Sequence, residues 1–136
     1  MSEKSTVLFI CQQNSGRSQI AEALLRWLYG DRYEAYSAGV ISSEINPYAI
    51  RVMEQLGVDM SGQRSKSIDA FRDMTFDTVV TVCDQAQANC PYFPGRHILH
   101  QCFASAPSTG SEAEIMAGFV RVRDEIRAWL ETQFGP

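Results

Sequence analysis

The sequence predicts an α/β fold, a single three-layer domain in which a four-stranded parallel sheet lies between helices, and two features predict it. Segments typical of buried strands alternate with segments of helical periodicity, which implies right-handed crossovers and a parallel sheet with helices on both faces. A chain of 136 residues suits one domain, residues 1–136, with one core. We expect the strand order 2-1-3-4, with the binding crevice at the carboxyl ends of the central strands.

The chain begins with a strand, a helix and a second strand. Residues 6–11 form an apolar run rich in β-forming residues, which is typical of a buried parallel strand. Residues 17–29 place apolar side chains at helical spacing before a stop signal at Gly30; these side chains are Ile20, Ala23, Leu24, Trp27 and Leu28. Residues 33–37 predict the second strand.

The middle of the chain contains a helix and two more strands. The pair Asn46-Pro47 predicts a helix start, because it combines a cap with proline in the first turn, and Gly57 predicts its end. The face expected to be buried consists of Ile50, Met53 and Leu56. Residues 77–83 have the strongest strand pattern of the chain, and residues 96–100 have a weaker one.

A long helix closes the chain. Ser111 and Glu114 form a capping box, and the helix that follows has the apolar face Ile115, Phe119, Val122, Ile126 and Leu130. The strands at residues 6–11 and 77–83 end on Cys11 and Cys83. Because these strands are parallel and central, we expect the two cysteines to meet at one edge of the sheet.

Charge and composition exclude several classes of function. A net charge of −4 and a pI near 5.1 argue against binding to nucleic acid or acidic membranes. No apolar run approaches the roughly 20 residues that cross a bilayer, and the apolar residues 7–10 are too few for a signal peptide core. We expect a cytoplasmic protein that acts as a monomer.

The four cysteines are separated by 72, 7 and 12 positions, so they contain no Cys-x2-Cys pair and no usual zinc pattern. In a reducing compartment they are poor candidates for a structural disulfide framework. Metal binding or redox chemistry by the thiols is the better first hypothesis. Cys102 has no supporting motif, and we expect it to pack as a small apolar side chain, with a spare redox thiol as the alternative.

The segment between the first strand and the first helix has the composition of an anion-binding loop: Cys11, Gln12, Gln13, Asn14, Ser15, Gly16, Arg17 and Ser18. Such a loop turns backbone N–H groups inward at the positive end of the helix, which suits a phosphate-like oxyanion. Arg17 adds a planar fork for two oxygens. The same field favours the nucleophilic thiolate of Cys11, to which Ser18 can donate, while Asn14 tolerates left-handed geometry. The alternative is a buried apolar Cys11 beside a solvated Arg17.

The loop and several other segments resemble the arsenate reductases built on the low-molecular-weight protein tyrosine phosphatase fold. The resemblance covers nearly the whole chain and is carried by residues 11–23, 37–39, 80–83, 90–91 and 119–126. The loop alone is shared with the phosphatases. The pair Cys83 and Cys90 points instead to the reductases.

The resemblance implies a substrate, a partner and a disulfide cascade. Cys11 attacks arsenate, for which phosphate and sulfate are mimics, and Cys83 then attacks Cys11 and releases arsenite. Cys90 attacks Cys83, and the resulting disulfide is reduced by an external dithiol, for which we expect thioredoxin. Because bridged cysteines have Cα atoms about 5.5 Å apart, residues 84–89 must loop back and rearrange on oxidation. The alternatives are a buried strand-end thiol at Cys83 and an idle exposed one at Cys90.

The sequence departs from this family where a general acid is expected. Members usually carry an Asp-Pro pair after the fourth strand, but residues 103–108 contain no carboxylate. A missing general acid removes about 10²–10⁴-fold from a step that needs it. Arsenate can lose an oxygen that is already protonated, whereas a tyrosine leaving group would suffer most. His97 and His100 have no partner that suggests proton transfer, so we expect both to be structural.

A second departure concerns a potassium ion that supports the loop in some relatives, with ligands that match Asn14, Glu22 and Ser37. Arg64 and Lys66 stand near the positions of its other ligands. We expect the Lys66 ammonium to replace the ion by reaching Glu22 and Asn14, so that no cofactor is needed. The alternative is that Lys66 is a solvated surface charge.

Three functions therefore remain open, and arsenate reduction is the main hypothesis. The second is a phosphotyrosine phosphatase that uses Cys11 and Arg17 alone; the missing acid and the extra cysteines disfavour it. The third is a non-catalytic oxyanion or redox sensor whose disulfide state is recognised by a partner.

Overall fold

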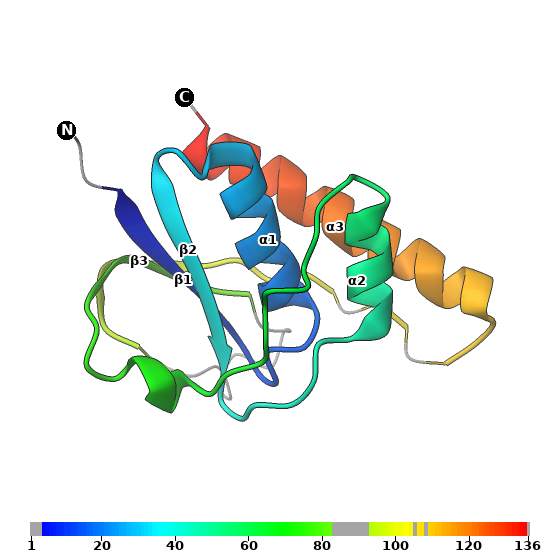
Figure 1. Ribbon diagram of the computed structural model, residues 1–136, viewed down its shortest axis with the longest axis horizontal. Coiled ribbons are helices and arrows are strands. Elements are labelled where there is room, and N and C mark those ends of the chain that lie inside the picture. Colours follow the sequence, from blue (N-terminus) through cyan, green and yellow to red (C-terminus); the bar gives the residue numbers. More distant parts are fainter. Residues whose placement is uncertain (1–3, 83–92, 105, 108, 136) are drawn as a thin grey trace.

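Four parallel strands form one sheet in the order β2-β1-β3-β4, which confirms the predicted order (Figure 1). The computed structural model of the chain describes residues 4–82, 93–104, 106–107 and 109–135. The strands are β1 (Ser5–Cys11), β2 (Tyr33–Gly39), β3 (Phe76–Thr81) and β4 (Gly95–His100). Each overlaps the segment predicted for it, and β3 ends before the predicted boundary.

The two faces of the sheet are covered by different elements. Helices α1 (Arg17–Tyr29), α2 (Pro47–Glu54) and α3 (Glu112–Phe134) lie on one face, over the larger core cluster (Figure 1). On the other face, the described residues contribute the short 3-10 helix η1 (Ile68–Phe71) and Phe93 to a smaller cluster. The predicted layered α/β architecture is therefore confirmed.

Strand β1 runs between these two layers. Val7 and Phe9 belong to the larger cluster, Leu8 and Ile10 belong to the smaller one, and all four side chains are fully buried. A strand that is covered on both faces has no solvated side. This burial explains why its sequence is a continuous apolar run and not an alternation of apolar and polar residues.

The predicted helix caps are present. The Asn46 side chain accepts a hydrogen bond from the Tyr48 N–H at the start of α2, and Ser111 and Glu114 form the reciprocal capping box of α3. No helix of the described residues is long and apolar enough to cross a bilayer.

The predicted buried faces of α1 and α2 are confirmed at Ile20, Ala23, Leu24 and Met53 and need correction at the other positions. In α2 the buried side chains are Ala49, Val52 and Met53, while Ile50 and Leu56 are only half-buried. Both sets have helical spacing, and the tertiary packing selects the one that contains the small Ala49. In α1 the Trp27 ring is 43% exposed, and it packs under the Arg127 guanidinium, 5.1 Å from the ring centroid.

Strands β1 and β3 approach the site edge of the sheet together. Cys11 is the last residue of β1, and the Val82 N–H donates to the Ile10 carbonyl at 2.9 Å. The chain therefore reaches residue 82 beside the residue that precedes Cys11. Cys83 and Cys90 lie outside the described residues, so their approach to Cys11 stays a prediction.

Candidate oxyanion site

The loop between β1 and α1 is held by its carbonyl groups. Six consecutive carbonyls accept hydrogen bonds from donors that lie outside the loop. In chain order the pairs are Cys11 with Val40 N–H (3.3 Å), Gln12 with Ile41 N–H (3.2 Å), Gln13 with the Ser65 hydroxyl (3.1 Å), Asn14 with the Gln19 amide (3.2 Å), Ser15 with Asn46 N–H (3.0 Å) and Gly16 with Ile20 N–H (2.9 Å).

This outward direction of the carbonyls fixes the direction of the amides. No described peptide bond is cis, and in a trans peptide the N–H points opposite to the carbonyl of the preceding residue. The N–H groups of residues 12–17 therefore face the inside of the loop. A run of inward amides at a helix start forms a concave site for an anion.

Cys11 lies at the base of this concavity. Its side chain is 4% exposed, its Sγ lies 2.8 Å from the Ser18 Oγ, and the Asn14 N–H donates to Sγ at 3.2 Å. The N-cap of α1 is Gly16, which provides no side-chain cap. The first amides of the helix are therefore not satisfied by a capping side chain and can serve an anion.

Asn14 supports the loop in a left-handed conformation, with φ 52°. Its side chain is fully buried; the Nδ2 donates to Ser18 Oγ at 2.9 Å, and the Oδ1 accepts from the Gln19 amide at 2.7 Å and from the Lys66 N–H at 2.8 Å. Asparagine tolerates this region better than most residues. The bonds join the loop to α1 and to the segment that precedes η1.

The carboxyl end of β2 presses against the same loop. A Cβ built on Gly39 would lie 2.7 Å from the Asn14 N and 2.8 Å from the Gln13 carbonyl carbon. These are backbone atoms that cannot turn aside. Only glycine allows β2 to approach the loop this closely.

A cavity of about 350 Å³ opens in front of Cys11. Its apolar wall is formed by Ala106, Phe119 and Val122. Its polar part consists of Asn46 and the loop residues Cys11, Gln12, Gln13, Ser15, Gly16 and Arg17. The Arg17 Nη1 donates to the Phe103 carbonyl at 2.7 Å, which ties the guanidinium to the segment after β4. Among the described residues that line the cavity there is no carboxylate.

Glu22 and Ser37 lie next to the loop in a second polar cluster. Glu22 is 5% exposed; its carboxylate accepts from the Ser37 hydroxyl at 2.5 Å and from Arg26 Nη2 at 2.7 Å. The Lys66 ammonium is 3.9 Å from Glu22 Oε1 and donates to the Arg64 carbonyl at 2.7 Å. This buried carboxylate therefore has two cations beside it.

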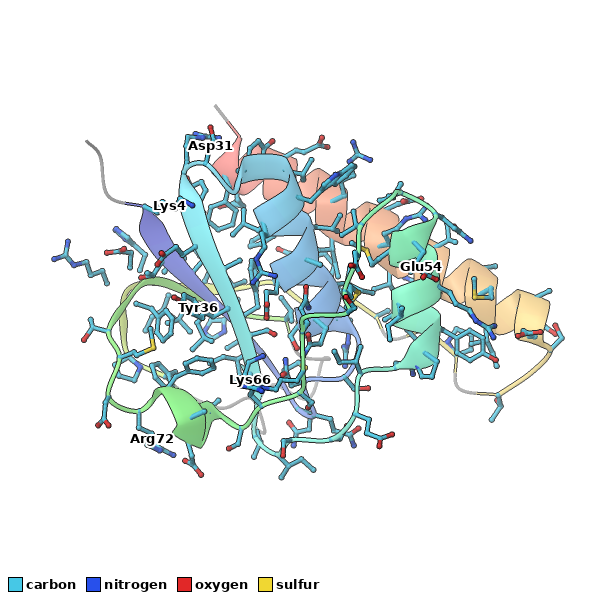
Figure 2. The ribbon with its side chains drawn as sticks, viewed as in Figure 1. Lys4, Asp31, Tyr36, Glu54, Lys66 and Arg72 are labelled. Carbon is cyan, nitrogen blue, oxygen red and sulfur yellow. The ribbon has the colours of Figure 1, made fainter. Side chains whose placement is uncertain are left out.

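The contacts of Lys66 divide between its ammonium and its backbone. The ammonium approaches Glu22, but Asn14 receives its bond from the Lys66 backbone N–H. Figure 2 shows Lys66 beside the carboxyl end of β2, where its carbonyl accepts from the Gly39 N–H at 2.9 Å. Burial lowers the pKa of the Lys66 ammonium, and the carboxylate of Glu22 opposes this shift. The side chain is therefore not a freely solvated charge.

The site includes two side chains that sequence reasoning missed, Gln19 and Gln63. Gln19 is fully buried on α1, and the Gln63 amide donates to its Oε1 at 2.7 Å. The available signal was a polar residue on the apolar side of α1, since Gln19 lies one turn before the buried Ala23.

The expectation that Cys102 packs as a small apolar side chain is wrong, because the structure places this residue on the surface. It follows β4, whose side chains are mostly exposed or half-buried, so the core does not reach it. His100 Nδ1 contacts the Thr81 hydroxyl, while His97 is exposed on β4. Among the described residues no group of three His, Cys, Asp or Glu could hold a metal ion.

Residues 6–132 match the family model of the low molecular weight phosphotyrosine protein phosphatases. The chain belongs to this family. Among its curated relatives is arsenate reductase 1 of Staphylococcus epidermidis, which is 38% identical over 130 residues, 96% of each chain. Arsenate reductase of Bacillus subtilis is 39% identical over 127 residues, 91% of each chain.

Solved structures extend this similarity to the fold. An arsenate reductase in the phosphate binding state is 28% identical and has a TM-score of 0.76, with 94% of this chain and 95% of that chain covered. A thioredoxin-dependent arsenate reductase of Corynebacterium glutamicum is 32% identical with a TM-score of 0.68, and the match covers 96% of this chain and 62% of that chain.

Proposed function

We propose that this protein reduces arsenate to arsenite, with Cys11 as the nucleophile. The observation that carries the proposal is the set of outward carbonyls between Cys11 and Gly16, which leaves inward amides around a buried sulfur. Arsenate is a tetrahedral oxyanion of the size and charge of phosphate, so this concavity suits it. The curated relatives named as arsenate reductases support the assignment.

The reaction needs three thiols. The Cys11 thiolate attacks arsenic and forms a sulfur–arsenic bond, while one protonated arsenate oxygen leaves as hydroxide and takes a proton from solvent to become water. Cys83 then attacks Cys11, the electron pair of the sulfur–arsenic bond passes to arsenic, and As(III) leaves as arsenite. Cys90 attacks Cys83 and frees Cys11, and an external dithiol reduces the Cys83–Cys90 disulfide. A thioredoxin is the proposed donor, because one structural neighbour is thioredoxin-dependent.

The residues around Cys11 take distinct roles in this scheme. The loop amides from Gln12 to Arg17 bind the oxyanion, and the guanidinium of Arg17 neutralises its charge. Ser18 and the Asn14 N–H stabilise the thiolate, because both lie within hydrogen-bond distance of Sγ. The described lining contains no carboxylate, and in this scheme the leaving oxygen departs with the proton that arsenate already carries.

A phosphatase is the second candidate, and one observation favours it. The cavity extends beyond the oxyanion loop along an apolar wall of Ala106, Phe119 and Val122, which suits an aryl group. The absence of a carboxylate from the described lining disfavours it, because a phenolate leaving group needs a proton. An aryl phosphate is therefore the competing substrate to test.

One experiment separates these functions. The reduced protein is incubated with stoichiometric arsenate, and arsenite and free thiols are counted for the parent, Cys83→Ser and Cys102→Ser. We expect one arsenite and two lost thiols per parent molecule, the same for Cys102→Ser, and neither for Cys83→Ser. Phosphate release from an aryl phosphate that continues in Cys83→Ser would indicate a phosphatase. Neither turnover in the parent would indicate a sensor.

We also propose that the loop needs no potassium ion. The residues do not fit one, because the Glu22 carboxylate already lies against Ser37, Arg26 and the Lys66 ammonium. A cation at this position would meet the positive charge of Lys66. Arsenate turnover is expected to be equal in potassium and in sodium buffers of the same ionic strength, and a potassium requirement would contradict the proposal.

A further inference from the structure

Gln19 is a large polar side chain in a place that usually holds an apolar one. It lies on α1 between the buried Ser18 and Ile20, and its relative exposure is 0%. Burying an amide costs free energy unless its donors and acceptors are satisfied. The side-chain hydrogen bonds of Gln19 go to Asn14 in the loop and to residues 63–64 beside it.

The side-chain amide of Gln19 donates to both the side chain and the backbone carbonyl of Asn14. The Nε2 lies 2.7 Å from Asn14 Oδ1, 3.2 Å from the Asn14 carbonyl and 3.0 Å from the Arg64 carbonyl. The bond to Oδ1 fixes the side-chain amide that donates to Ser18. The bond to the carbonyl fixes the peptide plane of a residue in the left-handed region.

Asn14 in turn makes one of the two contacts to the sulfur and supports the other, which Ser18 makes. Its backbone N–H donates to Cys11 Sγ at 3.2 Å, and its Nδ2 donates to the Ser18 Oγ, which lies 2.8 Å from Sγ. A rotation of Asn14 would therefore disturb both partners of the thiolate together. The other end of Gln19 is held by the Gln63 amide, which donates to Oε1 at 2.7 Å and to the Gln19 carbonyl at 3.2 Å.

We infer that Gln19 is a positioning residue that sets the reactivity of Cys11 through Asn14, with Gln63 as its support. The inference deepens the proposed function, since it rests on Cys11 as the nucleophile. Gln19 itself has no contact with Cys11 among the hydrogen bonds of the described residues. Without it, Asn14 loses two of the bonds that hold its conformation, and the thiolate loses well-placed donors.

The test is the alkylation of Cys11 by iodoacetamide, followed on the Cys11 peptide by mass spectrometry. Gln19→Leu keeps the side-chain size but removes every hydrogen bond. We expect its alkylation rate at pH 7 to fall several-fold to about tenfold, and its rate–pH profile to move to higher pH than that of the parent. Gln133→Leu, the same change on the exposed side of α3, is the matched control and should react as the parent does.

A double-mutant cycle separates positioning from general loosening. If Gln19 acts through Asn14, the variant with both Gln19→Leu and Asn14→Ala should react within about twofold of Asn14→Ala alone. Effects that multiply, or a folded Gln19→Leu that reacts as the parent does, would overturn the inference. If Gln19→Leu does not fold by circular dichroism, Gln63→Leu decides: a rate about threefold below the parent supports the inference, and a parental rate overturns it.

Alkylation requires no arsenate. A parent protein that fails to release arsenite would contradict the proposed function, while the rates of the Gln19 variants would still report on Cys11. The two results are therefore independent.

Discussion

The amino and the carboxyl edge of the sheet are both joined by hydrogen bonds that involve side chains, but the residues that make these bonds differ in burial. At the amino edge, Thr6 N–H donates to Asp77 Oδ2 at 2.9 Å and Asp77 N–H donates to Thr6 Oγ1 at 3.0 Å, with the Asp77 side chain 39% exposed. At the carboxyl edge, Asn14, Gln19 and Glu22 make comparable bonds at 0–5% exposure. Both edges join neighbouring segments through polar contacts of side chains.

The difference in depth changes what each bond controls. Water can replace a partner at the amino edge, so the loss of one bond there costs little. At the carboxyl edge no water replaces a lost partner, and among the described residues every buried side-chain nitrogen and oxygen has one. The buried edge therefore resists rearrangement, as the proposed nucleophile and anion site require.

The largest effect is expected from Glu22→Gln, which removes the buried charge between two cations. Arg26 and Lys66 lose their counter-ion, and Ser37 loses a charged acceptor. We expect the free energy of unfolding to fall by about 3 kcal/mol, discounted because Arg26 is partly exposed. Urea denaturation measures this free energy, and a fall of less than about 1 kcal/mol would contradict the view that polar contacts at the buried edge cost more to lose.

Gly39→Ala is expected to have the next largest effect. The added Cβ meets backbone atoms of the loop at 2.7–2.8 Å, so β2 or the loop must move. We expect a loss of about 2 kcal/mol and a fall in arsenate turnover of about tenfold or more. Gly62→Ala, whose Cβ would meet nothing within 4 Å, is the control. Equal effects at both glycines would be inconsistent with a tight approach.

Ser18→Ala is expected to lower the unfolding free energy less than Gly39→Ala does, and to slow the alkylation of Cys11 clearly. It removes the hydroxyl 2.8 Å from Cys11 Sγ and leaves the Asn14 amide without its acceptor. The expected cost is about 1.5 kcal/mol in unfolding free energy, with alkylation of Cys11 slowed about tenfold. Ser61→Ala, which removes an exposed hydroxyl bonded to Asp59, serves as the comparison and should leave both quantities near the parental values.

The smallest effect is expected from Asp77→Asn at the amino edge. The Thr6 N–H lowers the pKa of the Asp77 carboxyl, so the folded state favours the charged form. Its contribution is complete above the ordinary carboxyl pKa of about 4 and is lost as the pH falls through the lower folded-state value. We expect a loss under about 0.5 kcal/mol at pH 7 and none near pH 2, measured by urea denaturation at both pH values. A larger loss would show that polar contacts at the exposed amino edge stabilise the protein as much as those at the buried carboxyl edge.

Much of the fold was predictable because local patterns and tertiary packing agree. The apolar run of β1, the Asn46-Pro47 start of α2 and the Ser111 capping box each act within a few residues. The sequence could not predict which face of α2 is buried, since Ile50 and Val52 each belong to a helical stripe and the position of the neighbouring helices decides. The prediction that Cys102 is buried was wrong for the same reason, because burial is a property of the packed molecule.

The loop from Cys11 to Ser18 could be proposed as an oxyanion site from the sequence, because its residue types and its place at a strand–helix junction are local features. Its support could not. Gln19, Gly39, Gln63 and Lys66 come from separate segments, and their bonds to the loop exist only after the sheet has brought those segments together. The chemical groups of the candidate site can be read from a single segment of the chain. How each group is held depends on the folded molecule, because hydrogen bonds between distant residues need positions that no local pattern encodes.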